Sequence, residues 1–224
     1  MCGRYSIAAE PTEIEERFQA QFEEPMNPRY NAAPSQRLPV LLNADPRKII
    51  FAQWGILPAW ATRLSQKGGL INVRFETLRD KRTFRADLKS RRCLVPSNGF
   101  YEWKAAAGGK KVPFRITRKD GKLFAFAGLW EEESTASGQT RRFAIITTSA
   151  NERMQPIHAR MPVILADEDE RAWLEAEGAD IPGLLRVLEK PIPPEVLEVF
   201  QVSSKINAPK NDFSELIQRE YARL

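Results

Sequence analysis

The sequence predicts an α+β fold, a single domain over residues 1–224 with a curled, largely antiparallel, barrel-like β-sheet flanked by helices. Three observations predict this class. Short runs of β-branched and aromatic residues follow one another at close spacing, and helical patterns occur before, between and after them. No repeat or low-complexity linker divides the 224 residues, which are enough to bury one full core.

The first predicted element is a helix over residues 11–22. Thr12 and Glu15 have the spacing of a capping box, which satisfies backbone N–H groups at a helix N-terminus. An apolar residue recurs at every fourth position and gives the helix one buried face, made of Ile14, Phe18 and Phe22. This helix is expected to be structural.

The strands come next along the chain. One hairpin is predicted to join residues 39–43 to residues 48–55. A second hairpin, with Lys-Asp-Gly at its turn, is predicted to join residues 112–118 to residues 122–130. Further strands are expected at residues 93–97, 100–104, 141–149 and 161–165.

Further helices are predicted within residues 74–90, over residues 167–177 and in the C-terminal segment 211–224. The prolines of residues 179–196 predict a loop around a short helix. The order of the strands does not follow from these patterns.

The charge favours a polyanionic partner without establishing one. The formal net charge is +5, and residues 79–92 hold seven basic residues against two acidic ones, which predicts one positive face. A solvated helix flank is the alternative. With two cysteines and one histidine the chain cannot build a zinc site from Cys and His, and no metal or other cofactor is expected. No apolar run is long enough to span a bilayer and no signal-peptide pattern is present, so we expect a soluble, cytoplasmic protein that makes no membrane contact.

Cys2 directly follows the initiator Met1. Removal of Met1 would leave a 1,2-aminothiol, with an α-amine of reference pKa ~8 beside a thiol of reference pKa ~8.5. An aldehyde would react with both groups, because the amine forms an imine and the thiol can close onto the imine carbon as a five-membered thiazolidine. A retained Met1 would block the amine. The alternative is that Cys2 is a small apolar residue at a fraying terminus.

Several polar residues are unusual for packing. Asn72 and Arg74 alternate with apolar residues in a short extended piece, so an amide and a guanidinium on one side could bind a terminal amine and a phosphate. A half-exposed strand edge would look the same. The hydroxyls of Thr147 and Thr148 could bind phosphate oxygens.

Glu102 and His158 are candidates for proton transfer. Glu102 lies between Tyr101 and Trp103, where partial desolvation would raise its pKa, although simple alternation would leave it facing water. His158 is the only histidine, and its unperturbed pKa lies near ~6.5. A structural hydrogen bond is the alternative role for His158.

Eight motifs occur in a fixed order, namely MCGRYS, RYNAAPSQ, WGILPAW, INVRFET, FYEWK, AGLWE, AIITTSAN and IHARMPVIL. In this order they resemble the SOS-response-associated peptidase family, and the resemblance runs from residue 2 to about residue 212. It implies a protein that binds single-stranded DNA containing abasic sites and forms a thiazolidine crosslink to the lesion through Cys2. A slow strand-cleaving lyase reaction could accompany the crosslink.

The resemblance also implies the site residues. It places Asn72, Glu102 and His158 beside Cys2 as catalytic residues, with Asn72 holding the amine, Glu102 relaying protons and His158 assisting opening of the sugar ring. Nine residues are expected to contact DNA, namely Arg4, Asn31, Trp54, Pro58, Arg74, Arg82, Thr147, Thr148 and Arg160. Trp54 and Pro58 would act as a wedge or stacking surface. We expect a monomer.

Two other functions stay open. One is an N-terminal-nucleophile peptidase that exposes Cys2 by cleaving itself. The other is a non-covalent nucleic-acid reader that uses only the basic face, which would bind DNA regardless of Cys2 and of the lesion.

Overall fold

Two β-sheets organise the chain in the computed structural model, which describes residues 2–57, 69–80, 84–135, 138–176, 180–190 and 192–220. The strands are β1 (Tyr5–Ile7), β2 (Gln21–Phe22), β3 (Arg29–Ala32), β4 (Arg37–Leu42), β5 (Asp45–Trp54), β6 (Asn72–Arg74), β7 (Arg92–Ser97), β8 (Gly99–Ala105), β9 (Lys111–Arg118), β10 (Phe124–Thr135), β11 (Gly138–Ser149), β12 (Arg160–Pro162) and β13 (Leu197–Gln201). The α-helices are α1 (Pro11–Phe18), α2 (Phe75–Asp80), α3 (Arg85–Ser90), α4 (Asp167–Glu175) and α5 (Ile181–Glu189). Short 3-10 turns lie at Ala107–Gly109, Pro194–Val196, Ser204–Asn207 and Ser214–Ile217.

The larger sheet closes into a barrel. Strands β5, β4, β7, β10 and β11 pair antiparallel in that order. The ring is completed by β11 and β5, which pair in parallel over Arg142↔Gln53 and Phe143↔Trp54. Strand β6 also pairs with β11, in parallel, and β12 pairs with the C-terminal end of β11. The predicted α+β class with a barrel-like, largely antiparallel sheet is confirmed.

The smaller sheet has the order β13-β9-β8-β1-β3 and shares a core with the barrel. Tyr5 of β1 lies between the two sheets. Its ring centroid is 5.2 Å from that of Trp54 and 5.8 Å from that of Phe126, both in edge-on geometry. Full burial of side chains of this size stabilises the fold by about 1.5–3 kcal/mol each, so β1 is held firmly next to the N-terminal residues.

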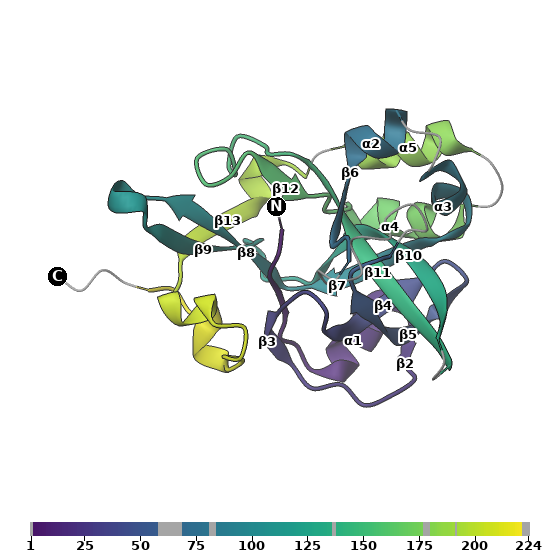
Figure 1. Cartoon of the computed structure of the whole chain (residues 1–224), viewed down its shortest axis with the longest axis horizontal. Coiled ribbons are helices and arrows are strands. Elements are labelled where there is room, and N and C mark those ends of the chain that lie inside the picture. Colours follow the sequence, from purple (N-terminus) through teal and green to yellow (C-terminus); the bar gives the residue numbers. More distant parts are fainter. Residues whose placement is uncertain are drawn as a thin grey trace.

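Helices α2, α3, α4 and α5 gather on one side of the barrel, and β9 and β13 project on the other (Figure 1). Arg92 fixes two of these helices to the sheet. Its buried guanidinium donates to the carbonyl oxygens of Leu88 and Lys89 at the end of α3, and to those of Trp173, Leu174 and Ala176 at the end of α4. Carbonyl oxygens at a helix C-terminus have no partner within their own helix, so this one side chain satisfies the C-terminal ends of both helices. None of the described helices is long and apolar enough to span a membrane.

The predicted hairpin of residues 112–118 with 122–130 is wrong. The turn does form, with Gly121 at φ +72° donating to the carbonyl oxygen of Arg118. However, β9 pairs with β8 and β13, whereas β10 pairs with β7 and β11. The turn therefore passes the chain from one sheet to the other, and the long hairpin of the structure is β10 with β11.

Two helix predictions also need correction. Helix α1 spans only Pro11–Phe18, because Pro11 starts it and Gln19 in the left-handed region ends it. The capping box is absent, and the Glu15 carboxylate instead accepts from the Phe22 N–H at 2.9 Å. The C-terminal segment forms no α-helix within its described residues. It holds a 3-10 turn at Ser214–Ile217 and then pairs with β13 through the Glu220 N–H and the Gln201 carbonyl oxygen.

Candidate functional site

Cys2 lies where the N-terminal segment enters the core. The side chain is fully buried, and the pairing of β1 with β8 continues before Tyr5, where the Tyr101 N–H donates to the Arg4 carbonyl oxygen at 3.0 Å. Burial raises the pKa of the Cys2 thiol well above its usual range, and the negative charge of Glu102 raises it further. The thiol is therefore protonated near neutral pH.

Asn72 holds the backbone of Cys2. It begins β6, whose pairing with β11 aligns Asn72 with Ile145. The Asn72 Nδ2 donates to the Cys2 carbonyl oxygen at 2.8 Å. The Oδ1 of Asn72 is buried and makes no hydrogen bond to any described residue. An amide acceptor is thus left beside the first residues of the chain.

Glu102 comes from β8 and is only 4% exposed. It faces the interior, so the water-facing alternative does not apply. The negative charge of Glu102 raises the pKa of the Cys2 thiol, so the two side chains lie near each other. Glu102, Asn72 and Cys2 therefore gather at one place from three separate parts of the chain.

His158 precedes β12 and is bound by its own loop. Its Nδ1 accepts a hydrogen bond from the Arg160 backbone N–H at 3.0 Å and lies 3.1 Å from the Arg160 carbonyl oxygen. The His158 N–H in turn donates to the Met154 carbonyl oxygen at 3.0 Å. The imidazole orientation thus depends on the position of Arg160.

Arg160 forms a bidentate ion pair with Glu76 of α2. The distances are 2.7 Å from Nη1 to Oε1 and 3.0 Å from Nη2 to Oε2. Nη2 also donates to the carbonyl oxygen of Thr147 at 2.7 Å and contacts its hydroxyl at 3.3 Å. The guanidinium lowers the pKa of the Glu76 carboxyl through these hydrogen bonds, so the pair is ionised at neutral pH.

Arg4 belongs to a second group of polar contacts. Its Nη1 donates to Oδ1 of Asn31 at 2.6 Å and to the carbonyl oxygen of Ile206 at 2.9 Å, and its guanidinium lies 5.8 Å from the Trp103 ring centroid. The Trp103 indole N–H donates to Asn207 at 2.7 Å. These contacts orient the Arg4 guanidinium beside Trp103 of β8, the residue that follows Glu102.

Three of the expected DNA contacts are buried. Trp54 is fully buried, stacks on Phe143 and donates to the Ile71 carbonyl oxygen, so its assignment as a base-stacking surface is wrong. Asn31 is also fully buried, with its amide satisfied by Arg4 and three carbonyl oxygens, so it positions Arg4 and has no face toward DNA. Thr147 is fully buried against Arg160, which hides its hydroxyl.

The remaining expected contacts differ in exposure. Arg74 is exposed and Thr148 is half-buried. Arg160 is partly exposed, with its guanidinium engaged as described above. Pro58 and Arg82 lie outside the described residues. In the basic stretch 79–92, Arg92 is buried and does not belong to a positive face, whereas Arg79, Arg85, Lys89 and Arg91 are exposed.

Sequence reasoning missed Glu76 and the contact between Trp103 and Asn207. Glu76 follows Arg74 by two positions, which gave no sign that its partner would come from a strand 84 residues further on. The described residues contain no cluster of His, Cys, Asp or Glu side chains able to hold a metal ion.

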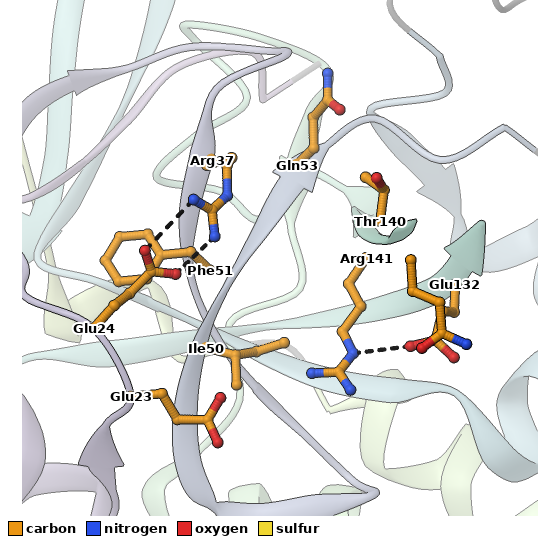
Figure 2. Close-up of a pocket in the computed structure, with 10 residues that line it drawn as sticks. Glu23, Glu24, Arg37, Ile50, Phe51, Gln53, Glu132, Thr140 and Arg141 are labelled. Atoms are coloured by element: carbon orange, nitrogen blue, oxygen red, sulfur yellow. Dashed lines mark hydrogen bonds and ion pairs between the residues drawn. The ribbon is translucent and has the colours of Figure 1, made fainter. Parts of the chain in front are cut away.

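The hollow drawn in Figure 2 lies away from Cys2, with a volume of about 460 Å³. It opens where β5 and β11 diverge, near the start of β11, whereas Asn72 pairs with the later part of that strand. Its guanidinium groups pair within the walls, Arg37 with Glu24 and Arg141 with Glu132. None of its lining residues belongs to the groups described above.

Comparisons with known proteins agree with one another. A family model described as "SOS response associated peptidase (SRAP)" matches residues 1–209. The chain is 43% identical over 223 residues to the abasic site processing protein YoqW of Bacillus subtilis (strain 168), covering 97% of this chain and 99% of the relative. It is 30% identical over 234 residues to the abasic site processing protein YedK of Escherichia coli (strain K12), covering 97% and 99%. A crystal structure of a Bacteroides thetaiotaomicron protein superimposes with a TM-score of 0.84 at 25% identity, covering 98% of this chain and 100% of the other.

Proposed function

Because the chain belongs to the SOS response associated peptidase family, we propose that it processes abasic sites in DNA. In this proposal it binds single-stranded DNA and links Cys2 covalently to the lesion as a thiazolidine. Relatives over nearly the whole chain carry the name abasic site processing protein. The buried group of Cys2, Asn72 and Glu102 supports the covalent step.

The chemistry begins after removal of Met1. The α-amine of Cys2 adds to the aldehyde of the ring-opened sugar, and the resulting carbinolamine loses water to give an imine. The thiol then adds to the imine carbon, with the thiol proton passing to the nitrogen. One carbon–nitrogen and one carbon–sulfur bond form, and one water leaves. The product is a neutral five-membered ring that no longer exposes an aldehyde.

The order of the two additions follows from the pKa of the thiol. Burial keeps the Cys2 thiol protonated near neutral pH, so a thiolate is scarce. An α-amine has a reference pKa of ~8 and is partly unprotonated there. The amine therefore attacks first, and the thiol reacts only when a base accepts its proton. Glu102 is the carboxylate whose negative charge acts on the thiol, which suits it to accept the thiol proton.

The observation that carries the proposal is the position of the Asn72 amide. Its Nδ2 binds the Cys2 carbonyl oxygen at 2.8 Å, and its buried Oδ1 has no hydrogen-bond partner among the described residues. A buried amide oxygen without a partner is costly, by about 1–3 kcal/mol. A free α-amine on Cys2 would supply the missing donor. The arrangement is thus suited to a chain that begins at Cys2.

His158 is assigned to opening of the sugar ring. In its neutral form the Nδ1 accepts from the Arg160 N–H, so the ring proton lies on Nε2 and can be donated to the ring oxygen of the closed sugar. Arg4 and the exposed Arg74 are assigned to backbone phosphates, for which arginine has suitable geometry.

The alternatives are less well supported. A cysteine peptidase needs a thiolate nucleophile. Burial raises the pKa of the Cys2 thiol and so disfavours the thiolate. A non-covalent reader would not use the buried contact between Asn72 and Cys2. A slow lyase reaction remains compatible with the proposal, because an imine permits β-elimination when the thiol does not close the ring.

The test is the denatured intact mass of the protein after incubation with a single-stranded oligonucleotide that carries one abasic site. We expect a species at the mass of protein without Met1 plus oligonucleotide minus water. Cys2→Ala should give no stable adduct, although its α-amine should still form an imine that borohydride traps. Cys93→Ala is the matched control, because Cys93 is the other buried cysteine, and it should crosslink normally. A stable adduct in Cys2→Ala, or none in wild-type protein lacking Met1, would refute the proposal.

A further inference from the structure

We propose that Glu76 is a positioning residue for His158: by holding the guanidinium of Arg160, it fixes the backbone that decides which imidazole nitrogen carries the proton. The first link is the ion pair, which has two parallel hydrogen bonds of 2.7 Å and 3.0 Å. The bidentate geometry restrains a guanidinium more than a single contact does. The Thr147 carbonyl oxygen, 2.7 Å from Nη2, adds a third restraint from β11.

The second link is the backbone of Arg160. Its N–H lies 3.0 Å from the His158 Nδ1 and can only donate, so Nδ1 must accept and the neutral imidazole carries its proton on Nε2. The Arg160 carbonyl oxygen lies 3.1 Å from the same nitrogen and can accept if Nδ1 becomes protonated. Both protonation states of His158 thus find a partner in one residue, provided that this residue stays in place.

The third link connects the part of the site around Cys2 with the part around His158. Asn72 opens β6, and α2, which carries Glu76, follows β6 without a break. Arg160 opens β12, which pairs with β11 from Thr147 to Ser149. The ion pair therefore ties the segment that holds the Cys2 backbone to the strand that follows His158. Arg160 is also the group that neutralises Glu76, with Arg74 adding a weaker attraction.

This assignment distinguishes positioning from phosphate binding. If Arg160 mainly binds phosphate, Glu76 competes with DNA for the guanidinium, and removal of the carboxylate would strengthen DNA binding without harming the reaction. If Glu76 positions His158 through Arg160, the same change slows the reaction at saturating DNA. The kinetic part of the inference rests on the proposed function, whereas the state of His158 can be measured without DNA.

The first experiment measures the His158 tautomer by nitrogen-15 NMR of the imidazole. Because the chain contains one histidine, the spectrum needs no assignment. In the wild-type protein at a pH where the imidazole is neutral, we expect Nδ1 to resonate as an acceptor nitrogen and Nε2 as a protonated one. In Glu76→Gln we expect the two signals to move toward each other, as a mixture of tautomers requires.

The matched control is Glu133→Gln. Glu133 pairs with Arg142 at 2.9 Å, and the two side chains are 38% and 14% exposed. Glu76 and Arg160 are 39% and 17% exposed. The two substitutions therefore remove ion pairs of similar exposure, and the control should leave the His158 signals unchanged. An unchanged spectrum in Glu76→Gln, or an equal change in Glu133→Gln, overturns the proposal.

The second experiment follows crosslinking to an abasic oligonucleotide under single-turnover conditions. We expect Glu76→Gln to lower the rate at saturating DNA about tenfold, since small misplacements of reacting groups are costly, and not to raise the half-saturating DNA concentration. Arg160→Gln should lower the saturating rate similarly, and the double variant should lose no more than the single ones. Glu76→Asp, which keeps the charge, should recover part of the rate and serves as the test if Glu76→Gln does not fold. An unchanged saturating rate in both Glu76 variants overturns the proposal. Absence of crosslinking in the wild type would refute the proposed function, while the NMR result would still decide the role of Glu76.

Discussion

The side-chain amide of Asn72 and the backbone of Cys2 are joined by a hydrogen bond of 2.8 Å from Nδ2 to the carbonyl oxygen. The contact joins residues 70 positions apart and is buried on both sides. It makes the placement of the N-terminal residue part of the folded core. The reactive amine of a chain beginning at Cys2 would then be held before DNA arrives, which removes much of the entropic cost of bringing the reacting groups together.

Replacement of Asn72 should therefore slow the covalent step. In Asn72→Leu the Cys2 carbonyl oxygen loses its donor at nearly constant side-chain volume. Leaving a buried group unsatisfied costs about 1–3 kcal/mol, which corresponds to a rate about 5-fold to 150-fold lower if the loss falls on the reacting geometry. Single-turnover crosslinking at saturating DNA measures it. Affinity for an undamaged single strand should stay the same, and an unchanged crosslinking rate would contradict the assigned role.

Removal of Arg74 should act on binding and leave the chemistry intact. Arg74 is exposed and ends the same short strand that begins with Asn72. If it neutralises one phosphate, Arg74→Gln should reduce the slope of log affinity against log salt by about 0.7 for a single strand. Fluorescence anisotropy with undamaged DNA across a salt series measures this slope. Arg171→Gln, an exposed arginine paired with Glu175 on α4, is the control and should leave the slope unchanged.

The sequence predicted most strands of the fold, but their partners only in part. Alternation and turn residues mark where a strand begins and ends, because these are local effects. Pairing is not local, and the turn at Gly121 shows the difference. It has the signature of a hairpin and forms a tight turn, yet β9 and β10 enter different sheets. The alternation of apolar residues marks both strands but does not identify the neighbour of either, so the pattern could not decide.

The site was predicted less completely than the strands. Cys2, Asn72 and Glu102 were singled out by their chemistry and by the family resemblance. In the structure, Asn72 and Glu102 do lie beside Cys2. Burial was harder to foresee. A tryptophan at the end of a strand suits base stacking as well as packing, and the closure of β5 on β11 places Trp54 against Phe143 in the core. The pair of Glu76 with Arg160 depends on a tertiary contact that no local pattern encodes.

Arg92 should be among the residues on which stability depends most. Its guanidinium is 1% exposed and donates to five backbone carbonyl oxygens at the ends of α3 and α4. Arg92→Met keeps much of the apolar stem but leaves those carbonyls unsatisfied, so we expect a loss of about 3 kcal/mol or more in the free energy of unfolding by urea. Arg92→Lys should recover little, because an ammonium has fewer donors in a different geometry. The neighbouring Arg91, exposed and 3.5 Å from Asp87, is the control, and Arg91→Met should change stability by no more than about 0.5 kcal/mol.

Cys93 should make the protein less stable in alkaline solution. Its thiol is fully buried beside Gly128, where even an added Cβ would lie 2.7 Å from the sulfur, and burial raises the pKa of the thiol. In the unfolded chain the thiol ionises near ~8.5, so as the pH rises the unfolded state releases its proton before the folded state does. The stabilising contribution is complete below that pH and is lost above it, by up to about 1.4 kcal/mol per pH unit. We therefore expect the free energy of unfolding to fall more steeply from about pH 8 to about pH 10 in the wild type than in Cys93→Ala, measured by urea titration.

The variant should be less stable at neutral pH, because it leaves a small cavity, so the slope and not the absolute value is the test. Equal slopes in the two proteins would mean that the Cys93 thiol also ionises in the folded state.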